Sequence, residues 1–485
     1  MLHPKVICRI IGLLLQLEAL FLTCSIGVSL YYNEENILSA YIYTIAALVG
    51  CGLLLTYIGY NKERNISRKD GYIVVTLCWI VFSMFGAMPY YISGYIPSIT
   101  DAFFETMAGF TTTGASVVAD MEIFPRSLIF WRIMTQWIGG LGIVFFTVAV
   151  LPIFGLGDLH LFAAETIGIA RAKLHPRISV TARWIMTIYV CLTLIEAVCL
   201  KFAGMGYFDS ICHAMSTMST GGISTKTGGI ASFNSPLIEY IIIIFMIMGG
   251  TSFSLLYLAL FKGRPKELFR DAEFKTYIRL VSFFTILIGI GLYVTENMSA
   301  ESTFRTALFQ VVSVITTTGF STTDYSHWTP VLWLLLSAAM FVGACSGSTT
   351  GAMKSIRVAI LGRVMANEFK RIVHPNAVIP VRMGGKVISE QVQSAIMAFT
   401  LLYVGMVVVG IFVNMSFGLN LVDAYGLSLS SVSNVGPGLG NYSSPNAMAS
   451  LPDVLKWFYS FQMLVGRLEF FAVLLLLTPV FWRKQ

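Results

Sequence analysis

The chain has 485 residues and a formal net charge of +7, and 56% of its residues are hydrophobic whereas only 12% are charged. Soluble domains carry about 25% charged residues, so this composition excludes a soluble globular protein and indicates an integral membrane protein. Long apolar runs such as residues 238–250 predict membrane-spanning helices, because barrel strands would show short alternating segments. The basic residues are spread over short loops, which is typical of cytoplasmic loops and argues against nucleic acid as a partner.

The first elements are two hydrophobic segments, at roughly residues 7–31 and 38–60. The first apolar run, about residues 10–32, is too long for the hydrophobic region of a signal peptide and lacks a small-residue cleavage site. We therefore expect a retained pair of transmembrane helices within residues 1–69.

Four similar modules follow this pair. Each contains a long apolar segment, a shorter half-hydrophobic segment, a stretch rich in Thr, Ser and Gly, and a second long apolar segment. We expect an all-α polytopic membrane protein in which four pseudo-repeats follow the N-terminal helix pair. The expected repeats are residues 70–175, 176–272, 273–385 and 386–485.

The stretches rich in Thr, Ser and Gly align with one another, and we call them the glycine loops. They are TTTGAS (111–116), STGGIS (219–224), TTTGFS (316–321) and SNVGPG (433–438), with aligned glycines Gly114, Gly222, Gly319 and Gly436. Thirteen residues earlier lie Asp101, Asp209, Thr306 and Asp423, and six residues earlier lie Ala108, Ser216, Ser313 and Ser430. Four matches at one spacing, each between two spanning candidates, are a strong repeat signal.

The basic segments predict the orientation of the chain. They lie at residues 61–69, 171–183, 262–279 and 357–386, and at the C-terminal Arg483 and Lys484. One spanning segment separates each of them from a glycine loop. Placing the basic segments in the cytoplasm gives ten spans, two cytoplasmic termini and four glycine loops near the outer face.

The half-hydrophobic segments are too short to cross a membrane. A helix of ten to twelve residues, at about 1.5 Å per residue, covers only part of a hydrocarbon core of about 30 Å, so each helix should enter and turn back. Its C-terminal end carries partial negative charge, and glycine permits backbone conformations that other residues resist. Four such ends around one axis predict a carbonyl-lined cation filter.

The predicted filter residues offer their backbone carbonyls to potassium, and they follow each half-helix directly. They are Thr112, Thr113, Gly114, Thr220, Gly221, Gly222, Thr317, Thr318, Gly319, Asn434, Val435 and Gly436. Potassium would be the substrate, bound at these residues only, and we expect no other metal and no cofactor in this chain. Because the four quarters differ in sequence, we expect only a modest preference for potassium over sodium. The alternative is that these loops are re-entrant turns that cap helices around no ion.

The second apolar segment of the third module, about residues 330–361, is interrupted by glycine and hydroxyl residues. Glycine costs about 1 kcal/mol relative to alanine inside a helix, so this run should break the helix near mid-membrane, below the filter. The alternative is a kink that allows close helix packing. The candidate gate residues are Gly343, Cys345, Ser346, Gly347, Ser348, Thr349 and Gly351 in this stretch, together with Lys354 and Arg467.

Three charged residues lie in or beside the long apolar segments of the second half of the chain. Lys354 is either a snorkelling residue or a cation near the ion path that raises the barrier to transport. Arg467 and Glu469 lie inside the last apolar segment, where charges are costly and by default functional. They should not pair with each other, because residues two apart on a helix do not face each other. In the first repeat, Arg132 and Gln136 are expected to brace the bundle rather than contact the ion.

The whole chain resembles the Trk/Ktr/HKT superfamily of potassium transporters, and most closely its bacterial TrkH-type branch, which has the extra N-terminal helix pair. The resemblance rests on the four glycine loops, on WRIMTQWIGGLGIV (131–144), on GACSGSTTGAMKSIR (343–357) and on GRLE (466–469). In plant relatives, serine at the position of Gly114 goes with sodium transport, so glycine here supports potassium.

The resemblance implies a channel-like potassium uptake subunit in a bacterial cytoplasmic membrane. It implies a homodimer with one pore per chain, controlled by a cytoplasmic ring of TrkA-like nucleotide-binding subunits. It also implies that the stretch around residues 343–354 blocks the pore beneath the filter, and that Arg467 faces the pore and hinders cations. The basic segments 262–279 and 357–386 are the docking candidates for the regulatory ring. With no nucleotide domain in the sequence up to residue 485, we expect regulation to come from another chain or to be absent.

Two other functions can be compared with a gated potassium pore. An intramembrane hydrolase is not expected, because the turn from Cys345 to Ser348 lacks a base, and His213 is the only histidine in a half-helix. A sodium- or proton-coupled potassium symporter would use broken helices at a midplane site. The sequence favours a gated pore but does not decide whether transport is coupled.

Overall fold

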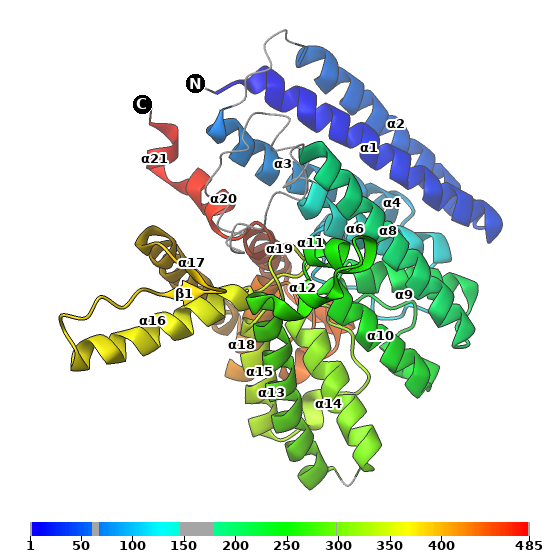
Figure 1. Cartoon of the computed structure of the whole chain (residues 1–485). Helices are drawn as coiled ribbons and strands as arrows, with labels where there is room; N and C mark the ends of the chain where they lie inside the picture. The colour runs from blue at the N-terminus through cyan, green and yellow to red at the C-terminus, as the bar shows by residue number, and fades with distance from the viewer. Residues whose placement is uncertain (1, 61–66, 146–177, 297, 484–485) are drawn as a thin grey trace.

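The computed structural model describes residues 2–60, 67–145, 178–296 and 298–483. These residues are almost entirely helical, as Figure 1 shows, and the fold is the expected all-α polytopic architecture. Parts of the basic segments used to predict orientation, residues 61–66 and 171–177 and Lys484, lie outside the described residues.

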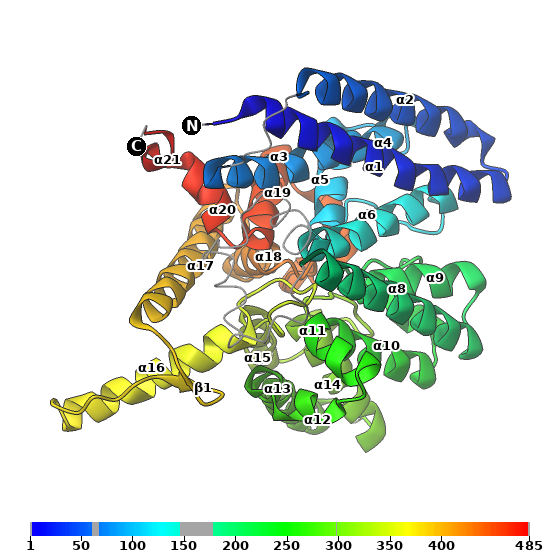
Figure 2. The same cartoon turned by 45° about the horizontal axis from the view of Figure 1, so that its top comes forward.

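The N-terminal pair is an antiparallel hairpin of α1 (Pro4–Tyr31) and α2 (Glu35–Ile58). A Cβ atom added to Gly12 would lie 2.6 Å from the carbonyl oxygen of Gly52, so the two glycines let the helix backbones approach closely. The hairpin lies along one side of the molecule (Figures 1 and 2), where α1 packs on the first repeat. The expected pair of membrane helices is therefore present.

Each repeat begins with a long helix, continues with a half-helix and ends with a second helix. The first repeat contains α3 (Arg68–Gly86), α4 (Met88–Ile92), α5 (Ile99–Phe110) and α6 (Arg126–Phe145). The second contains α8 (Ile178–Phe202), α9 (Tyr207–Met218), α10 (Pro236–Gly249), α11 (Phe253–Leu256), a π-helical turn (Tyr257–Phe261) and α12 (Pro265–Arg270).

The third and fourth repeats follow the same order. The third contains α13 (Ala272–Thr295), α14 (Ala300–Ile315), α15 (Pro330–Phe341), α16 (Ser355–Val373), β1 (Arg382–Met383) and β2 (Lys386–Val387). The fourth contains α17 (Glu390–Ser416), α18 (Leu421–Ser433), α19 (Asp453–Arg467), α20 (Phe471–Leu474), a 3-10 turn (Leu475–Leu477) and α21 (Pro479–Trp482). Short 3-10 turns lie at Gly229–Phe233, Tyr325–His327, Gly440–Tyr442 and Pro445–Ser450.

The four half-helices are α5, α9, α14 and α18, and each leads into a glycine loop. They have 12 to 16 residues, which is too short to cross a hydrocarbon core of about 30 Å. Side chains cap three of their N-termini, since Ser98, Ser299 and Asn420 each accept a backbone N–H of the first turn. Figure 2 shows the half-helices arranged around the middle of the molecule.

The second helices of the repeats are broken more often than the sequence suggested. Six described helices are long and apolar enough to span a membrane, and two further spans are bent pairs, with angles of 103° after Gly249 and 112° after Arg467. In the third repeat the break separates α15 from α16, as predicted. The sequence analysis singled out a break only in the third repeat, so it did not predict the breaks in the second and fourth repeats.

Packing against the half-helices explains the break in the fourth repeat. A Cβ atom added to Gly466 would lie less than 3.0 Å from the Val432 carbonyl oxygen, so the α19 backbone touches the end of α18. Immediately afterwards Glu469 and Phe470 have positive φ values of 53° and 62°, and the Phe471 N–H donates to the Glu469 carbonyl at 2.6 Å. That bond closes a γ-turn, which reverses the chain.

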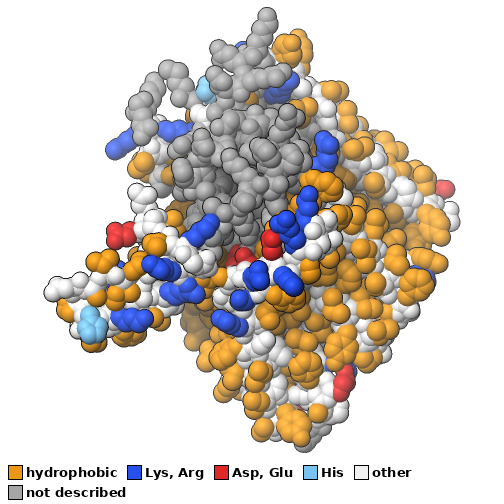
Figure 3. Space-filling view, viewed as in Figure 1, with side chains coloured by type: hydrophobic (Ala, Val, Ile, Leu, Met, Phe, Trp, Pro, Cys, Tyr) orange, Lys and Arg blue, Asp and Glu red, His pale blue; other side chains and the backbone are white. Residues whose placement is uncertain are grey.

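The surface separates an apolar side from a basic one. Figure 3 shows hydrophobic side chains covering the side formed by α9, α10, α13 and α14, and Lys and Arg gathered over α12 and α16. Helix α16 projects from the body together with the β1–β2 hairpin (Figures 1 and 2). Apolar side chains hold the hairpin against the helix base, among them Ile360 and Met383.

Candidate functional site

The glycine loops share one unusual backbone conformation. The second residue of each loop is left-handed: Thr112, Thr220, Thr317 and Asn434 have φ values of 53°, 55°, 52° and 57°. The aligned glycines Gly114, Gly222, Gly319 and Gly436 also have positive φ, at 81°, 72°, 81° and 98°. The loops are therefore not simply extended, because each chain first turns sharply off the half-helix.

One backbone hydrogen bond recurs in all four loops. The residue before each aligned glycine donates its N–H to the carbonyl six residues before that glycine, where the sequence carries a small residue. The bonds are Thr113 to Ala108 (2.9 Å), Gly221 to Ser216 (2.9 Å), Thr318 to Ser313 (2.8 Å) and Val435 to Ser430 (3.0 Å). The spacing seen in the sequence thus corresponds to a common turn of the backbone.

The aligned glycines close a ring around one axis. A Cβ atom added to any of them would lie less than 3.0 Å from a carbonyl oxygen of the next repeat. The pairs run in order: Gly114 to Gly221, Gly222 to Thr318, Gly319 to Val435, and Gly436 back to Thr113. Glycine is therefore required at these positions by space as well as by conformation. The twelve predicted filter residues are brought together, and all are buried.

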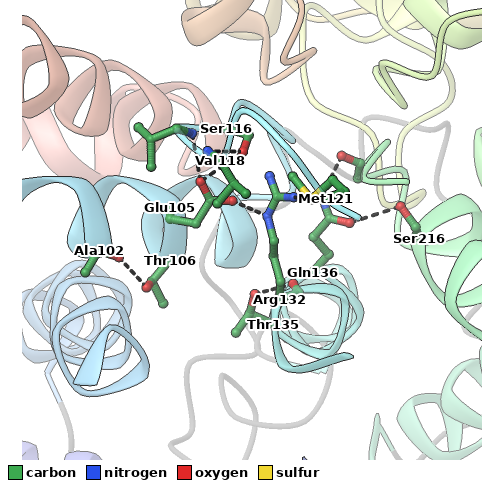
Figure 4. Close-up of polar contacts among 12 residues, drawn as sticks. Ala102, Glu105, Thr106, Ser116, Val118, Met121, Arg132, Thr135, Gln136 and Ser216 are labelled. Atoms are coloured by element: carbon green, nitrogen blue, oxygen red, sulfur yellow. Dashed lines mark hydrogen bonds and ion pairs between the residues drawn. The ribbon is translucent and has the colours of Figure 1, made fainter. Parts of the chain in front are cut away.

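The ring is not uniform, because one of its carbonyls accepts a hydrogen bond from a side chain. Gln136 donates from Nε2 to the Gly221 carbonyl at 2.6 Å and accepts from the Ser216 hydroxyl at 3.0 Å. Figure 4 shows Gln136 on α6 reaching toward Ser216. Gln136 thus supports the glycine loop of the neighbouring repeat, which refines the expected role in bracing the bundle.

Arg132 and Glu105 form a buried ion pair behind the first glycine loop (Figure 4). Glu105 also accepts the Ser116 hydroxyl at 3.1 Å and the Val117 N–H at 2.9 Å. A buried charge is costly unless it is paired and hydrogen-bonded. The positive charge of Arg132 thus compensates the negative charge of Glu105, and the Glu105 carboxylate in turn holds the chain after Gly114 through its hydrogen bonds.

A cavity of about 330 Å³ lies where the chain leaves the glycine loops, just after the aligned glycines. Its lining includes Gly114, Gly222, Gly319, Lys226 and Asp324. The cavity therefore lies next to three of the four aligned glycines.

Asp324 brings a carboxylate to this cavity. Partial burial raises the pKa of Asp324, but the N–H and hydroxyl of Ser326, the hydroxyl of Ser443 and nearby His327 together outweigh it and hold the pKa below its ordinary value. The carboxylate is therefore ionised at neutral pH and adds negative charge at the entrance to the ring.

The broken segment of the third repeat lies against the other end of the glycine loops. Thr349 donates from Oγ1 to the Met218 carbonyl at 3.2 Å. The Gly351 N–H donates to Thr317 Oγ1 at 2.8 Å, and the Ala352 N–H donates to the Ser433 carbonyl at 3.0 Å. Residues 343–354, which we call the intramembrane loop, therefore touch three of the four repeats next to the ring.

The intramembrane loop is held in place at its two ends and along its length. The Gly343 N–H donates to the Met353 carbonyl at 2.7 Å, which closes the loop at its base. The Cys345 N–H donates to the Gly250 carbonyl at 3.0 Å, and the Ser346 N–H donates to Glu273 Oε1 at 2.5 Å. Further hydrogen bonds run from the Phe253 N–H to the Gly347 carbonyl and from the Ser348 hydroxyl to the Cys345 carbonyl.

Two buried cations belong to this region. Arg467 donates to the Thr349 carbonyl at 2.6 Å and to the Gly139 carbonyl at 3.1 Å, so it links the intramembrane loop to α6. Lys354 donates to the Thr350 carbonyl within the loop. The structure therefore brings together all the predicted gate residues, including the two whose role the sequence left open.

Sequence reasoning missed several partners in this site. Glu469 pairs with Arg357 on α16, a contact between segments 112 residues apart that no local pattern indicates. His213, for which the sequence analysis found no role, is fully buried, and its Nε2 lies 3.0 Å from the Ser224 hydroxyl. The signal that could have found it was its place in the repeat alignment, nine residues before Gly222.

Comparison with known proteins shows the family of this chain. A family model described as TrkH, cation transport protein, matches residues 33–483. The "Trk system potassium uptake protein TrkH" of Halomonas elongata is 36% identical over 482 residues, which is 99% of each chain. The protein of the same description from Escherichia coli K12 is 36% identical over 491 residues, which cover 99% of this chain and 100% of the relative.

A solved structure of a similar protein has the same fold as this chain. The crystal structure of the potassium transporter TrkH from Vibrio parahaemolyticus matches with a TM-score of 0.90 and 34% identity over 99% of both chains. The fold and the ring thus define a membrane protein of the cation-transporter class, which is not a class of enzymes. More specifically, the chain belongs to the TrkH family of cation transport proteins.

Proposed function

We propose that this protein takes up potassium across a bacterial cytoplasmic membrane through a gated, channel-like pore. The observation that carries the proposal is the closed ring of four glycines, each packed on a carbonyl of the next repeat. A ring of backbone carbonyls replaces the hydration shell of a potassium ion. The relatives described as potassium uptake proteins support the choice of ion.

The pore would bind potassium at the carbonyls of the twelve filter residues named above. The ends of four half-helices point partial negative charge toward the same axis. The Gly221 carbonyl accepts from Gln136, so the second quarter would offer its ion a weaker ligand than the others. We therefore propose a preference for potassium over sodium that is real but modest.

The intramembrane loop and Arg467 would form the gate, and the structure would represent a closed state. The loop lies against Thr317 and Thr220 at the end of the ring opposite the cavity. Arg467 adds a positive charge at the same level, which repels a passing cation in a medium of low dielectric. Opening would require the loop to leave its hydrogen bonds with the glycine loops.

A sodium- or proton-coupled symporter is the second candidate. The observation that favours it is the pair of sharply bent spans, α10 with α11 and α19 with α20, because coupled transporters use broken helices near the midplane. The ring of four equivalent loops favours the pore.

Regulation would come from other chains. We propose a homodimer with one pore per chain and a cytoplasmic ring of TrkA-like nucleotide-binding subunits. With the termini on the cytoplasmic side, that ring would dock on the basic surface formed by α12 and α16, shown in Figure 3. Lys266 and Arg270 on α12 and Lys370 and Arg371 on α16 would supply its positive charge.

Competition for rubidium uptake tests the proposed filter. The purified protein is placed in liposomes, and rubidium influx is measured with potassium or sodium as competitor, for the wild type and for Gly319→Ser. A side chain at Gly319 would meet the Val435 carbonyl and a backbone with φ of 81°. We expect potassium to compete far better than sodium in the wild type. In the variant the ratio of potassium to sodium competition should fall at least about tenfold, which corresponds to a loss of about 1.4 kcal/mol in the binding preference for potassium.

The matched control is Gly418→Ser. Gly418 also has positive φ, at 88°, but nothing lies within 4 Å of an added Cβ atom. This variant should keep the preference for potassium. Wild-type influx on which potassium and sodium compete equally would contradict the proposed function.

A further inference from the structure

A second set of equivalent residues lies behind the ring, nine positions before each aligned glycine. These residues are Glu105, His213, Gln310 and Leu427, one on each half-helix, and all four are buried. Two positions after each aligned glycine lie Ser116, Ser224, Ser321 and Gly438. The first set faces the second across a separation of 11 residues in every repeat.

In the first repeat the link is made by a carboxylate. The Ser116 hydroxyl donates to Glu105 Oε2 at 3.1 Å and accepts the Val118 N–H at 2.9 Å. Figure 4 shows Glu105 pointing to the chain that leaves the ring at Ser116. The chain after Gly114 is therefore tied to the middle of its own half-helix.

In the second repeat an imidazole takes the same place. His213 Nδ1 lies 2.8 Å from the Asp209 carbonyl, which only accepts, so Nδ1 carries a proton. In the neutral ring Nε2 then accepts the Ser224 hydroxyl at 3.0 Å, while Ser224 accepts the Lys226 N–H at 3.1 Å. The pattern is the one seen in the first repeat, built from a different side chain.

In the third repeat an amide makes the link with the opposite polarity. Gln310 donates from Nε2 to the Ser321 hydroxyl at 3.0 Å, and Ser321 donates onward to the Thr323 carbonyl at 2.5 Å. The fourth repeat has no polar link at these positions. There a Cβ atom added to Gly438 would lie 3.3 Å from Leu427 Cδ2, so the chain rests on an apolar side chain instead.

We propose that Glu105, His213 and Gln310 are positioning residues for ion selectivity, each holding the strand after its filter glycine against the half-helix. They do not contact the ion; they act through the serine two residues after the glycine. The tolerance for movement is small, because each glycine packs directly on a carbonyl of the next repeat. A strand that loses its link can move outward and widen the ring, which favours loss of discrimination rather than loss of conduction.

This inference rests on the proposed potassium pore. It implies that the four glycine loops of the ring differ in stiffness. Three quarters carry this buried side-chain link, whereas in the fourth Leu427 offers only packing at the same position and the Gly438 carbonyl instead accepts the Tyr325 hydroxyl at 3.0 Å. A net hydrogen bond is worth roughly 0.5–1.5 kcal/mol, so losing one link should reduce the preference for potassium over sodium by about 3- to 10-fold.

The second repeat offers the sharpest test, because the chain itself supplies the replacements. His213→Leu copies the fourth repeat and removes the link, His213→Gln copies the third repeat and can keep it, and Ser224→Ala removes the hydroxyl without touching the half-helix. The double variant His213→Leu with Ser224→Ala completes a cycle. The readout is the ratio of potassium to sodium competition in rubidium influx, which the amount of folded protein does not change.

The control is Tyr425→Phe, which removes a hydrogen bond between half-helix α18 and the Ser337 hydroxyl of α15. We expect His213→Leu and Ser224→Ala each to lower the competition ratio, the double variant to lower it no further, and His213→Gln and Tyr425→Phe to keep it. Non-additivity is the mark of two residues acting through one bond. If His213→Leu does not fold, Ser224→Ala and Gln310→Leu carry the same expectation.

Two results would overturn the inference by itself. The first is that Ser224→Ala keeps the wild-type ratio of potassium to sodium competition and that a folded His213→Leu or Gln310→Leu variant keeps it as well. The second is that His213→Gln lowers this competition ratio as far as His213→Leu does. A wild-type protein without potassium-competed influx would instead overturn the proposed function, and this inference with it.

Discussion

At the residue scale, the ring depends on side chains that tolerate an unfavourable backbone. Thr112, Thr220 and Thr317 are left-handed, a conformation that β-branched residues rarely adopt. The cost of such a residue is of order 1–3 kcal/mol. Backbone hydrogen bonds off the end of each half-helix, such as Thr113 to Ala108, hold the turn against this cost. Only the fourth repeat uses a residue suited to the conformation, Asn434.

The buried pair of Glu105 and Arg132 predicts a stability effect at this scale. Arg132→Met would leave the Glu105 carboxylate buried without its cation, and breaking a buried pair from one side costs about 3–5 kcal/mol. We expect a clear fall in the thermal unfolding midpoint of the detergent-solubilised protein. Glu301→Gln, which disrupts an exposed pair with Arg305 on α14, should leave the midpoint nearly unchanged. Equal effects of the two variants would contradict the assignment.

Arg467 allows a second prediction at the same scale. Replacing it by glutamine removes a positive charge next to the ring and keeps a donor for the Thr349 carbonyl. We expect basal rubidium influx of the protein in liposomes to rise several-fold, with the competition ratio of potassium to sodium retained. A fall in influx, with the variant folded, would show that Arg467 assists rather than hinders the ion.

At the element scale, spacing made the repeats predictable, because each half-helix and glycine loop is a local unit whose register the aligned glycine fixes. The break between α15 and α16 was also predictable, since glycines and hydroxyl residues crowd that stretch. The break after α19 was not. It depends on Gly466 packing against Val432 and on Glu469 pairing with Arg357, which are contacts with other segments. The same reason hid the bond from Gln136 to Gly221, made between two repeats.

Shortening the intramembrane loop is the prediction that belongs to this scale. Deleting residues 345–351 removes the segment that lies against Thr220 and Thr317. We expect basal rubidium influx to increase while potassium still competes better than sodium, because the ring itself is untouched. The same deletion combined with Gly319→Ser should conduct without that preference. A deletion variant that folds but conducts no faster than the wild type would contradict the role as a gate.

At the scale of the whole molecule, the proposed homodimer can be tested directly. The proposed homodimer would have twice the mass of the 53.4 kDa chain after correction for bound detergent. Light scattering on the purified protein measures this mass directly. A single-chain mass at all concentrations would contradict the dimer and leave the ring within each chain unaffected.

The driving force for transport tests the central claim most directly. Liposomes that contain the wild-type protein are loaded with potassium and diluted into potassium-free medium with a trace of labelled rubidium, and rubidium accumulation is followed with no sodium or pH gradient. A pore allows potassium to leave and set a negative potential inside, so we predict that rubidium accumulates inside. Accumulation that occurs only after a sodium or pH gradient is imposed would contradict a channel-like pore and establish a coupled symporter.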